Sequence, residues 1–139
     1  MKHDPVESLL RLRQMTADQA RRHLAECLRA ESEAAAMITA IKAAIAHEME
    51  AASNLAAGDT EVEAFAAWLR TMRPRQQAAL AAQVAAEAGT SESRAVLGAA
   101  RAAVRAAEAV LEKNNAAAQA EMARKAQDQI DEVASRTKA

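Results

Sequence analysis

His23 and Cys27 are the two side chains whose types and spacing could do chemistry. They lie four residues apart, so on a helix they share one face, which is the spacing of two metal ligands. Two ligands are too few to hold a metal ion, and Cys27 also fits a position in an apolar seam between helices. We therefore expect no metal site at this pair.

Other catalytic signatures are missing from the sequence. It contains no glycine-rich phosphate loop, no His-Glu-x-x-His, no Cys-x-x-Cys and no nucleophile elbow. His3 and His47 are far from His23 in the sequence, and a pair of helices offers no concave pocket that would exclude water around an acid and a base. We expect a protein without enzymatic activity or cofactor, which acts through the faces and ends of its helices.

The composition predicts a thin all-helical protein. Among 139 residues, 51% are hydrophobic but only 1% are aromatic, and 41 are alanine, which favours helix strongly and buries little surface. The net charge is −1, with both signs interspersed, so nucleic acid is not an expected partner. There is no signal-peptide core and no apolar run of about 18 residues, which suggests a cytoplasmic protein.

An apolar stripe with a period of 3.5 residues runs along the first part of the chain. Asp4, Pro5 and Glu7 mark the start of its helix. This pattern indicates a helix over about residues 5–55 whose narrow seam lies against another helix. Eleven of the fourteen seam positions are apolar, and the full set is Leu10, Arg13, Ala17, Ala20, Leu24, Cys27, Glu31, Ala34, Ile38, Ile41, Ile45, Glu48, Ala52 and Leu55.

A corner and a short amphipathic helix are predicted over residues 56–73. Gly58 fits the left-handed residue after a helix, and Thr60 and Glu63 have the spacing of a capping box. Next come four apolar residues with helical spacing, ending before Pro74: Phe65, Trp68, Leu69 and Met72. They could cap the end of the core, or they could form an exposed anchor for a partner, and both interpretations stay open.

A second helix over about residues 75–136 is predicted to be the partner of the first. Its seam is Leu97, Ala100, Val104, Ala107, Leu111 and Ala118, with Asn114 as the polar member that fixes the register. Leu80 and Val84 leave this line, so we predict a kink or break near 89–93. Beyond Ala118 the seam jumps by four to Met122 and Ala126, which is a stutter.

These elements predict one all-α domain over residues 1–139. We expect a long antiparallel two-helix coiled-coil hairpin, with the short amphipathic helix at its tip and both termini at the other end. That arrangement would bring the arginines near the start of the first helix alongside the charged tail of the second.

The two ends of the chain resemble the FliJ family, the stalk proteins of flagellar type III export, which are related to the stalk proteins of secretion injectisomes. At the start, the resemblance rests on Leu9-Leu10-Arg-Leu12-Arg13, followed by Ala20 and Leu24. At the end, Arg124-Lys-Ala-Gln127-Asp-Gln-Ile130-Asp131-Glu132 is similar to the family's Arg-x-Glu-Gln-x-x-Leu-Asp-Glu. Ala126 replaces the Glu of that motif, and Ile130 replaces the Leu.

The resemblance implies a stalk that sits in the ring of the hexameric export ATPase and stimulates it. It further implies contacts with the export gate and with substrate chaperones, at the flagellar base on the cytoplasmic side of the inner membrane. The tip residues Phe65, Trp68, Leu69 and Met72 are then candidates for the gate or a chaperone. The candidates for the ATPase ring are Arg11, Arg13, Arg21, Arg124, Gln127, Asp131 and Glu132.

Two alternatives belong to other functional classes. A homo-oligomeric scaffold would use the same seam between chains. A phasin-like protein that binds a lipid surface would also be helical and rich in alanine, but it should show a broad apolar face instead of a narrow seam. The arginines between Arg11 and Arg29 fit either a solvated face with salt bridges or a docking surface for an acidic partner.

Overall fold

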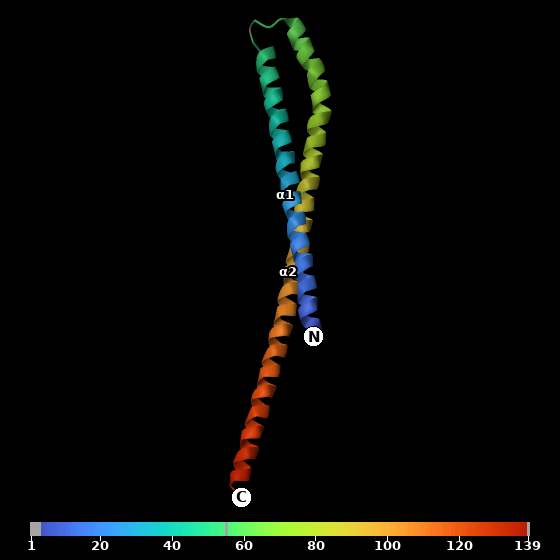
Figure 1. Cartoon of the computed structure of the whole chain (residues 1–139). Coiled ribbons are helices and arrows are strands. Elements are labelled where there is room, and N and C mark those ends of the chain that lie inside the picture. Colours follow the sequence, from blue (N-terminus) through green and yellow to red (C-terminus); the bar gives the residue numbers. More distant parts are fainter. Residues whose placement is uncertain (1–3, 55, 139) are drawn as a thin grey trace. The chain divides into compact units, whose positions relative to one another are not determined.

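A computed structural model describes residues 4–54 and 56–138. Two helices account for nearly all of them, α1 (Pro5–Ala52, 48 residues) and α2 (Asp59–Thr137, 79 residues) (Figure 1). No strand occurs in these ranges, so the all-α prediction is confirmed. His3 and Leu55, which the sequence analysis considered, lie outside the described residues.

Local hydrogen bonds explain where α1 begins and ends. The Val6 amide donates to Asp4 Oδ1 at 2.9 Å, which satisfies one of the amides left free at a helix start. Pro5 is the first helical residue, as predicted. After Ala52 the chain turns, and Asn54 accepts there from the Ala57 amide at 2.9 Å.

The start of α2 differs from the predicted capping box. The Gly58 amide donates to Glu61 Oε2 at 2.8 Å, so a Glu side chain reaches back over the first turn, as in a capping box. The residues are Gly58 and Glu61, two positions before the predicted Thr60 and Glu63. No described glycine has a positive φ, so the left-handed role predicted for Gly58 is wrong.

The predicted tip helix is the first part of α2. The structure has one continuous helix from Asp59 through Pro74, although proline has no amide to donate and leaves the Arg70 carbonyl without its helical partner. Pro74 is exposed, so water can reach this turn. The helix also continues unbroken through residues 89–93.

Contacts divide the chain into two units, which we call the hairpin unit (residues 20–97) and the terminal unit (residues 4–19 and 98–138). In the hairpin unit, α1 and α2 lie side by side and run in opposite directions (Figure 1). Ile38 and Ile41 of α1 form its core with Ala79 of α2, and Ile45 and Met72 pack against them. The predicted antiparallel hairpin is therefore present in this unit.

The seam of α2 in the hairpin unit contains polar residues. Leu80 and Val84 are 42% and 67% exposed, because the buried line passes beside them. That line follows steps of four and three through Met72, Gln76, Ala79, Gln83, Ala86, Thr90, Ser93 and Leu97, all buried or half-buried. The seam therefore keeps its register near 89–93 and continues there with small polar side chains.

In the terminal unit, the two helices pack through alanine. Ala17 of α1 and Ala100 and Ala107 of α2 are buried, and the seam ends at the half-buried Leu111. Every residue from Glu112 to Lys138 is exposed. We call this segment, residues 112–138, the arm. At 1.5 Å per residue it is about 40 Å of single helix.

Two predictions about this part of the chain are wrong. Asn114 and Ala118, which were assigned to the seam, are exposed, because α1 does not cover α2 beyond Leu111. Because α1 does not lie beside the arm, Arg11 and Arg13 do not lie alongside the charged tail of α2.

Candidate interaction surfaces

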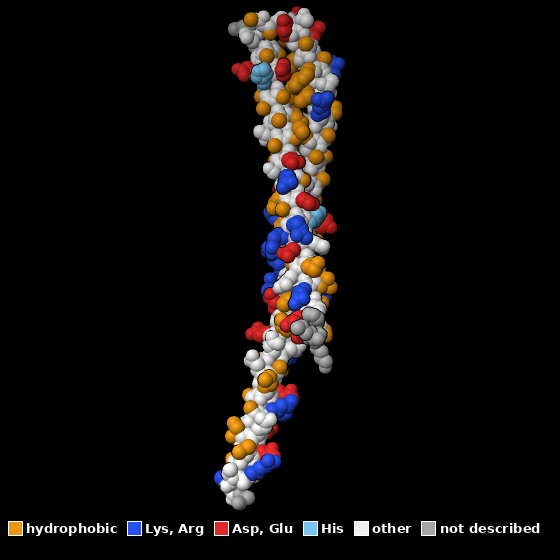
Figure 2. All heavy atoms as spheres, in the orientation of Figure 1, with side chains coloured by type: hydrophobic (Ala, Val, Ile, Leu, Met, Phe, Trp, Pro, Cys, Tyr) orange, Lys and Arg blue, Asp and Glu red, His pale blue; other side chains and the backbone are white. Residues whose placement is uncertain are grey.

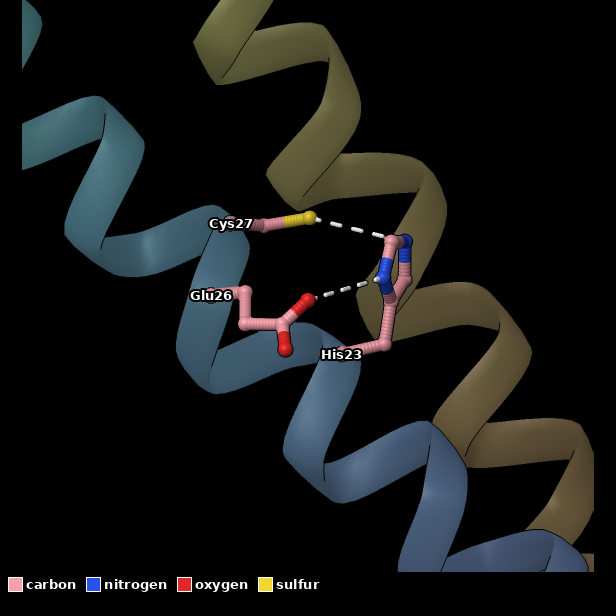
Figure 3. Close-up of polar contacts among 3 residues, drawn as sticks. All are labelled: His23, Glu26 and Cys27. Atoms are coloured by element: carbon pink, nitrogen blue, oxygen red, sulfur yellow. Dashed lines mark hydrogen bonds and ion pairs between the residues drawn. The ribbon is translucent and has the colours of Figure 1, made fainter.

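His23, Glu26 and Cys27 form a polar cluster on one face of α1 (Figure 3). Cys27 Sγ lies 3.7 Å from His23 Nε2, and His23 Nδ1 lies 3.9 Å from Glu26 Oε2. A thiol, an imidazole and a carboxylate in this order are the parts of an activated nucleophile. However, the side chains of His23 and Glu26 are 66% and 76% exposed, so water surrounds the cluster instead of a substrate pocket.

The cluster also lacks the ligands for a metal. Figure 3 shows the Cys27 thiol and the Glu26 carboxylate both directed toward the ring of His23. Within the ranges that the structure describes, no group of three or more His, Cys, Asp or Glu side chains is placed to hold a metal ion. Cys27 is half-buried, as its seam position predicts.

The candidate tip residues lie along the start of α2. Phe65 and Trp68 stack with ring centroids 6.1 Å apart and an interplanar angle of 29°. Both rings and Leu69 are half-buried. Met72 packs against the core of the hairpin unit. The structure thus combines features of the two interpretations, since these residues cover the end of the core and leave part of each ring accessible.

Shallow depressions flank Phe65 in the hairpin unit. One lies between α1 and α2 and is lined by Ile45, Met49, Leu69 and Gln76, among others. A second is lined by Ala52, Ala64 and Trp68. These depressions could accept apolar side chains of a partner, which is how aromatic anchors are often used at protein interfaces.

The candidate ring residues do not form a single cluster. Arg11 and Arg13 are exposed on α1 in the terminal unit, whereas Arg21 belongs to the hairpin unit. Arg124, Gln127, Asp131 and Glu132 all lie on the arm. There, Gln127 Nε2 donates to Asp131 Oδ1 at 2.8 Å, and Glu132 accepts from Arg136 at 2.6 Å.

The arm carries an apolar stripe that sequence analysis recognised only in part. Met122, Ala126, Ile130 and Val133 follow one another at steps of four, four and three, which places them on one face of a helix. Met122 is 71% exposed, and Ile130 and Val133 are each 61% exposed. The predicted seam ended at Ala126. Two further steps along the helix, of four and three residues, lead to Ile130 and Val133 and complete the stripe.

Charged pairs lie beside this stripe. Lys125 Nζ is 3.2 Å from Glu121 Oε1, and Arg136 Nη2 is 2.6 Å from Glu132 Oε1. In Figure 2 the apolar side chains of the arm gather on one side and the charged ones on the other. Such a face resembles half of a coiled coil whose second helix is not in the structure.

Neither helix, over its described residues, is long and apolar enough to cross a membrane. Comparisons of the chain with models of protein families, with characterised proteins and with solved structures found no match.

Proposed function

We propose that this protein is a non-enzymatic stalk or adaptor of the bacterial flagellar type III export apparatus, bound in the ring of the export ATPase. The observation that carries the proposal is the arm. Most of the stability of helices in proteins comes from packing against a neighbour, so a partner that covers the arm would stabilise it. The resemblance of both chain ends to the FliJ family identifies the class of partner.

The surface chemistry of the terminal unit fits such a role. Arg11 and Arg13 project from α1, and the arm carries both basic and acidic side chains. Long charged side chains on a helical rod can make many weak, exchangeable contacts with a surrounding ring. These contacts would bias the arrangement of the ring subunits without any chemistry by the stalk.

The hairpin unit would then contact other export components. Its half-buried Phe65–Trp68 pair and the depressions beside it are the surfaces we assign to the export gate or a substrate chaperone. The protein would act on the cytoplasmic side of the inner membrane, held there by its partners.

ATP turnover by the candidate hexameric ATPase tests this function. We expect no hydrolysis by the stalk alone and a higher rate when it is added to the hexamer. Arg11→Glu with Arg13→Glu, or removal of the chain from Arg124 onward, should weaken stimulation. The effect should also fall with salt, because exposed charges are screened over about 8 Å at physiological ionic strength.

Arg75→Glu with Arg94→Glu is the matched control, since it makes the same change of charge at exposed positions of α2 in the hairpin unit. Equal stimulation by the wild type and both terminal-unit variants, with helicity unchanged, would refute the assignment of this end to the ring.

The phasin-like alternative has less support. Adsorption to a lipid surface needs a broad apolar face, whereas the exposed apolar residues of the arm form one narrow stripe. The scaffold alternative, in which copies of the chain pair through a helical seam, is favoured by the order of charges beside the same stripe.

A further inference from the structure

We propose that the arm binds the arm of a second copy of this chain, with the two helices antiparallel. The inference starts from the stripe of Met122, Ala126, Ile130 and Val133, which no described residue covers. Ala126, Ile130 and Val133 also line a shallow depression together with Gln129. A stripe of this width, with steps of three and four, is the geometry that one further helix covers.

The order of charges beside the stripe indicates which helix that is. Along the flank lie Glu121 and Lys125, then Asp128, then Glu132 and Arg136, so a pair of opposite charges stands on each side of Asp128. When a second arm runs in the opposite direction, with a twofold axis beside residues 128 and 129, Lys125 comes opposite Glu132 of the second copy. In the same register, Glu121 comes opposite Arg136 of the second copy. The twofold axis repeats both pairs, so four contacts between opposite charges form at once.

The apolar residues agree with this register. Met122 comes within two residues of the position opposite Val133 of the second copy, and Ala126 comes within one residue of the position opposite Ile130. The surface is therefore complementary to itself, as a twofold interface between identical chains requires. Charge order and apolar spacing are separate properties of the sequence, and the registers that they favour agree to within two residues.

A parallel arrangement does not have this complementarity. Two parallel arms in register would place Lys125 near Lys125 of the second copy and Glu132 near Glu132. The usual contacts between flanks of parallel coiled coils, five residues apart, would join Lys125 to Ile130 and Glu132 to Thr137, which are not ion pairs. The charges therefore favour the antiparallel dimer.

This inference does not rest on the export ATPase. It does have a consequence for the proposed function, since a second copy and a different partner cannot cover the same stripe at once. Dimerisation would then compete with any binding that uses the arm.

Charge reversal in the full-length chain tests the pairing. An acidic variant, Lys125→Glu with Arg136→Glu, makes all four paired residues negative, and a basic variant, Glu121→Lys with Glu132→Lys, makes all four positive. Each variant alone turns four attractive contacts into repulsive ones. Each exposed ion pair contributes little by itself, but four of them change sign together, so the dimer dissociation constant should rise about 100-fold.

Mixing the two variants provides the decisive measurement. In the mixture, opposite charges face each other again between chains, so sedimentation equilibrium should show a heterodimer with nearly wild-type affinity. The ion pairs within each helix remain broken in both variants, so this rescue cannot come from helix stability. Lys113→Glu with Lys138→Glu is the matched control, because it makes the same charge change at exposed residues outside the flank and should leave dimerisation unchanged.

Disulfide formation tests the orientation. In a Cys27→Ser background, Lys125→Cys and Glu132→Cys should crosslink when the two proteins are mixed, and each alone should crosslink weakly. A wild-type chain that stays monomeric up to high micromolar concentration would overturn the proposal, as would a mixture of charge variants without rescue. Efficient crosslinking of each cysteine variant with itself would overturn the antiparallel arrangement.

Discussion

Ile41 offers the sharpest test of how the hairpin unit is held together. Its side chain is 8% exposed and belongs to the small core that α1 and α2 share with Ile38 and Ala79. We predict that Ile41→Asp strongly destabilises this unit, because the change removes a buried aliphatic side chain and puts a carboxylate in its place.

The size of the effect follows from two costs. Truncating a buried Ile costs roughly 2–5 kcal/mol, and the lower end applies here because a core between only two helices can collapse onto the gap. A carboxylate at this site gains no cationic partner, and its incomplete hydration adds about 1–2 kcal/mol. The total is roughly 3–4 kcal/mol at pH 7.

Urea unfolding followed by circular dichroism at 222 nm measures this loss. Met37→Asp is the matched control: Met37 lies one turn earlier on α1 and is 57% exposed, so the same new charge should cost less than about 1 kcal/mol. Lowering the pH provides an internal check on this loss of stability. Poor hydration raises the pKa of the new carboxyl in the folded state above its unfolded value of about 3.9, so the deficit should shrink as the pH falls toward 4.

Equal destabilisation by the two variants would refute the assignment of Ile41 to a buried seam. So would a deficit at Ile41 that is independent of pH, because the carboxylate would then be fully hydrated in the folded protein.

Three further predictions follow from particular side chains. Pro74→Ala should stabilise the hairpin unit by about 1–3 kcal/mol in the same unfolding assay, since it restores the amide that the Arg70 carbonyl lacks; a loss of stability would mean that Pro74 fits a local bend. Thr90→Val should raise stability by about 1 kcal/mol, because Thr90 Oγ1 is buried and has no hydrogen-bond partner and valine has nearly the same shape; destabilisation would show that the hydroxyl is satisfied in solution. Trp68→Ala should weaken capture of an export gate protein or chaperone by at least about 2 kcal/mol while lowering stability by less, and a large stability loss without a separate binding defect would identify Trp68 as a capping residue only.

The seam of α1 could be predicted almost completely from the sequence. All described apolar positions of its heptad pattern are buried or half-buried, while Arg13 and Glu48 are exposed. The pattern succeeded because Leu24, Ile38 and Ile45 are large enough to mark the buried face unambiguously.

The seam of α2 could not be predicted in the same way. Its buried line uses Gln76, Gln83, Thr90 and Ser93, whereas the conspicuous apolar residues nearby, such as Val84, are exposed. Apolar periodicity carries no signal along this line, because polar side chains occupy about half of its positions.

For the candidate surfaces, the sequence predicted which residues take part but not how exposed they are. Spacing placed Phe65 and Trp68 on one face, but how far α1 would cover their rings depended on the corner between the helices. Likewise, the motif around Arg124 gave no sign that α1 would stop covering α2 at Leu111, since the lengths of the two helices and their register decide that together.

The alanine seam also affects how this protein should respond to temperature. The chain exposes 10742 Å², where a compact globular protein of 14.8 kDa exposes about 7,000 Å². The heat capacity of unfolding comes mainly from newly hydrated apolar surface, and it averages about 12–15 cal/mol/K per residue in globular proteins. A chain that buries mostly alanine has less such surface to hydrate, so its value should be lower. Its stability curve should therefore be flatter, with weaker cold destabilisation and a broad thermal transition.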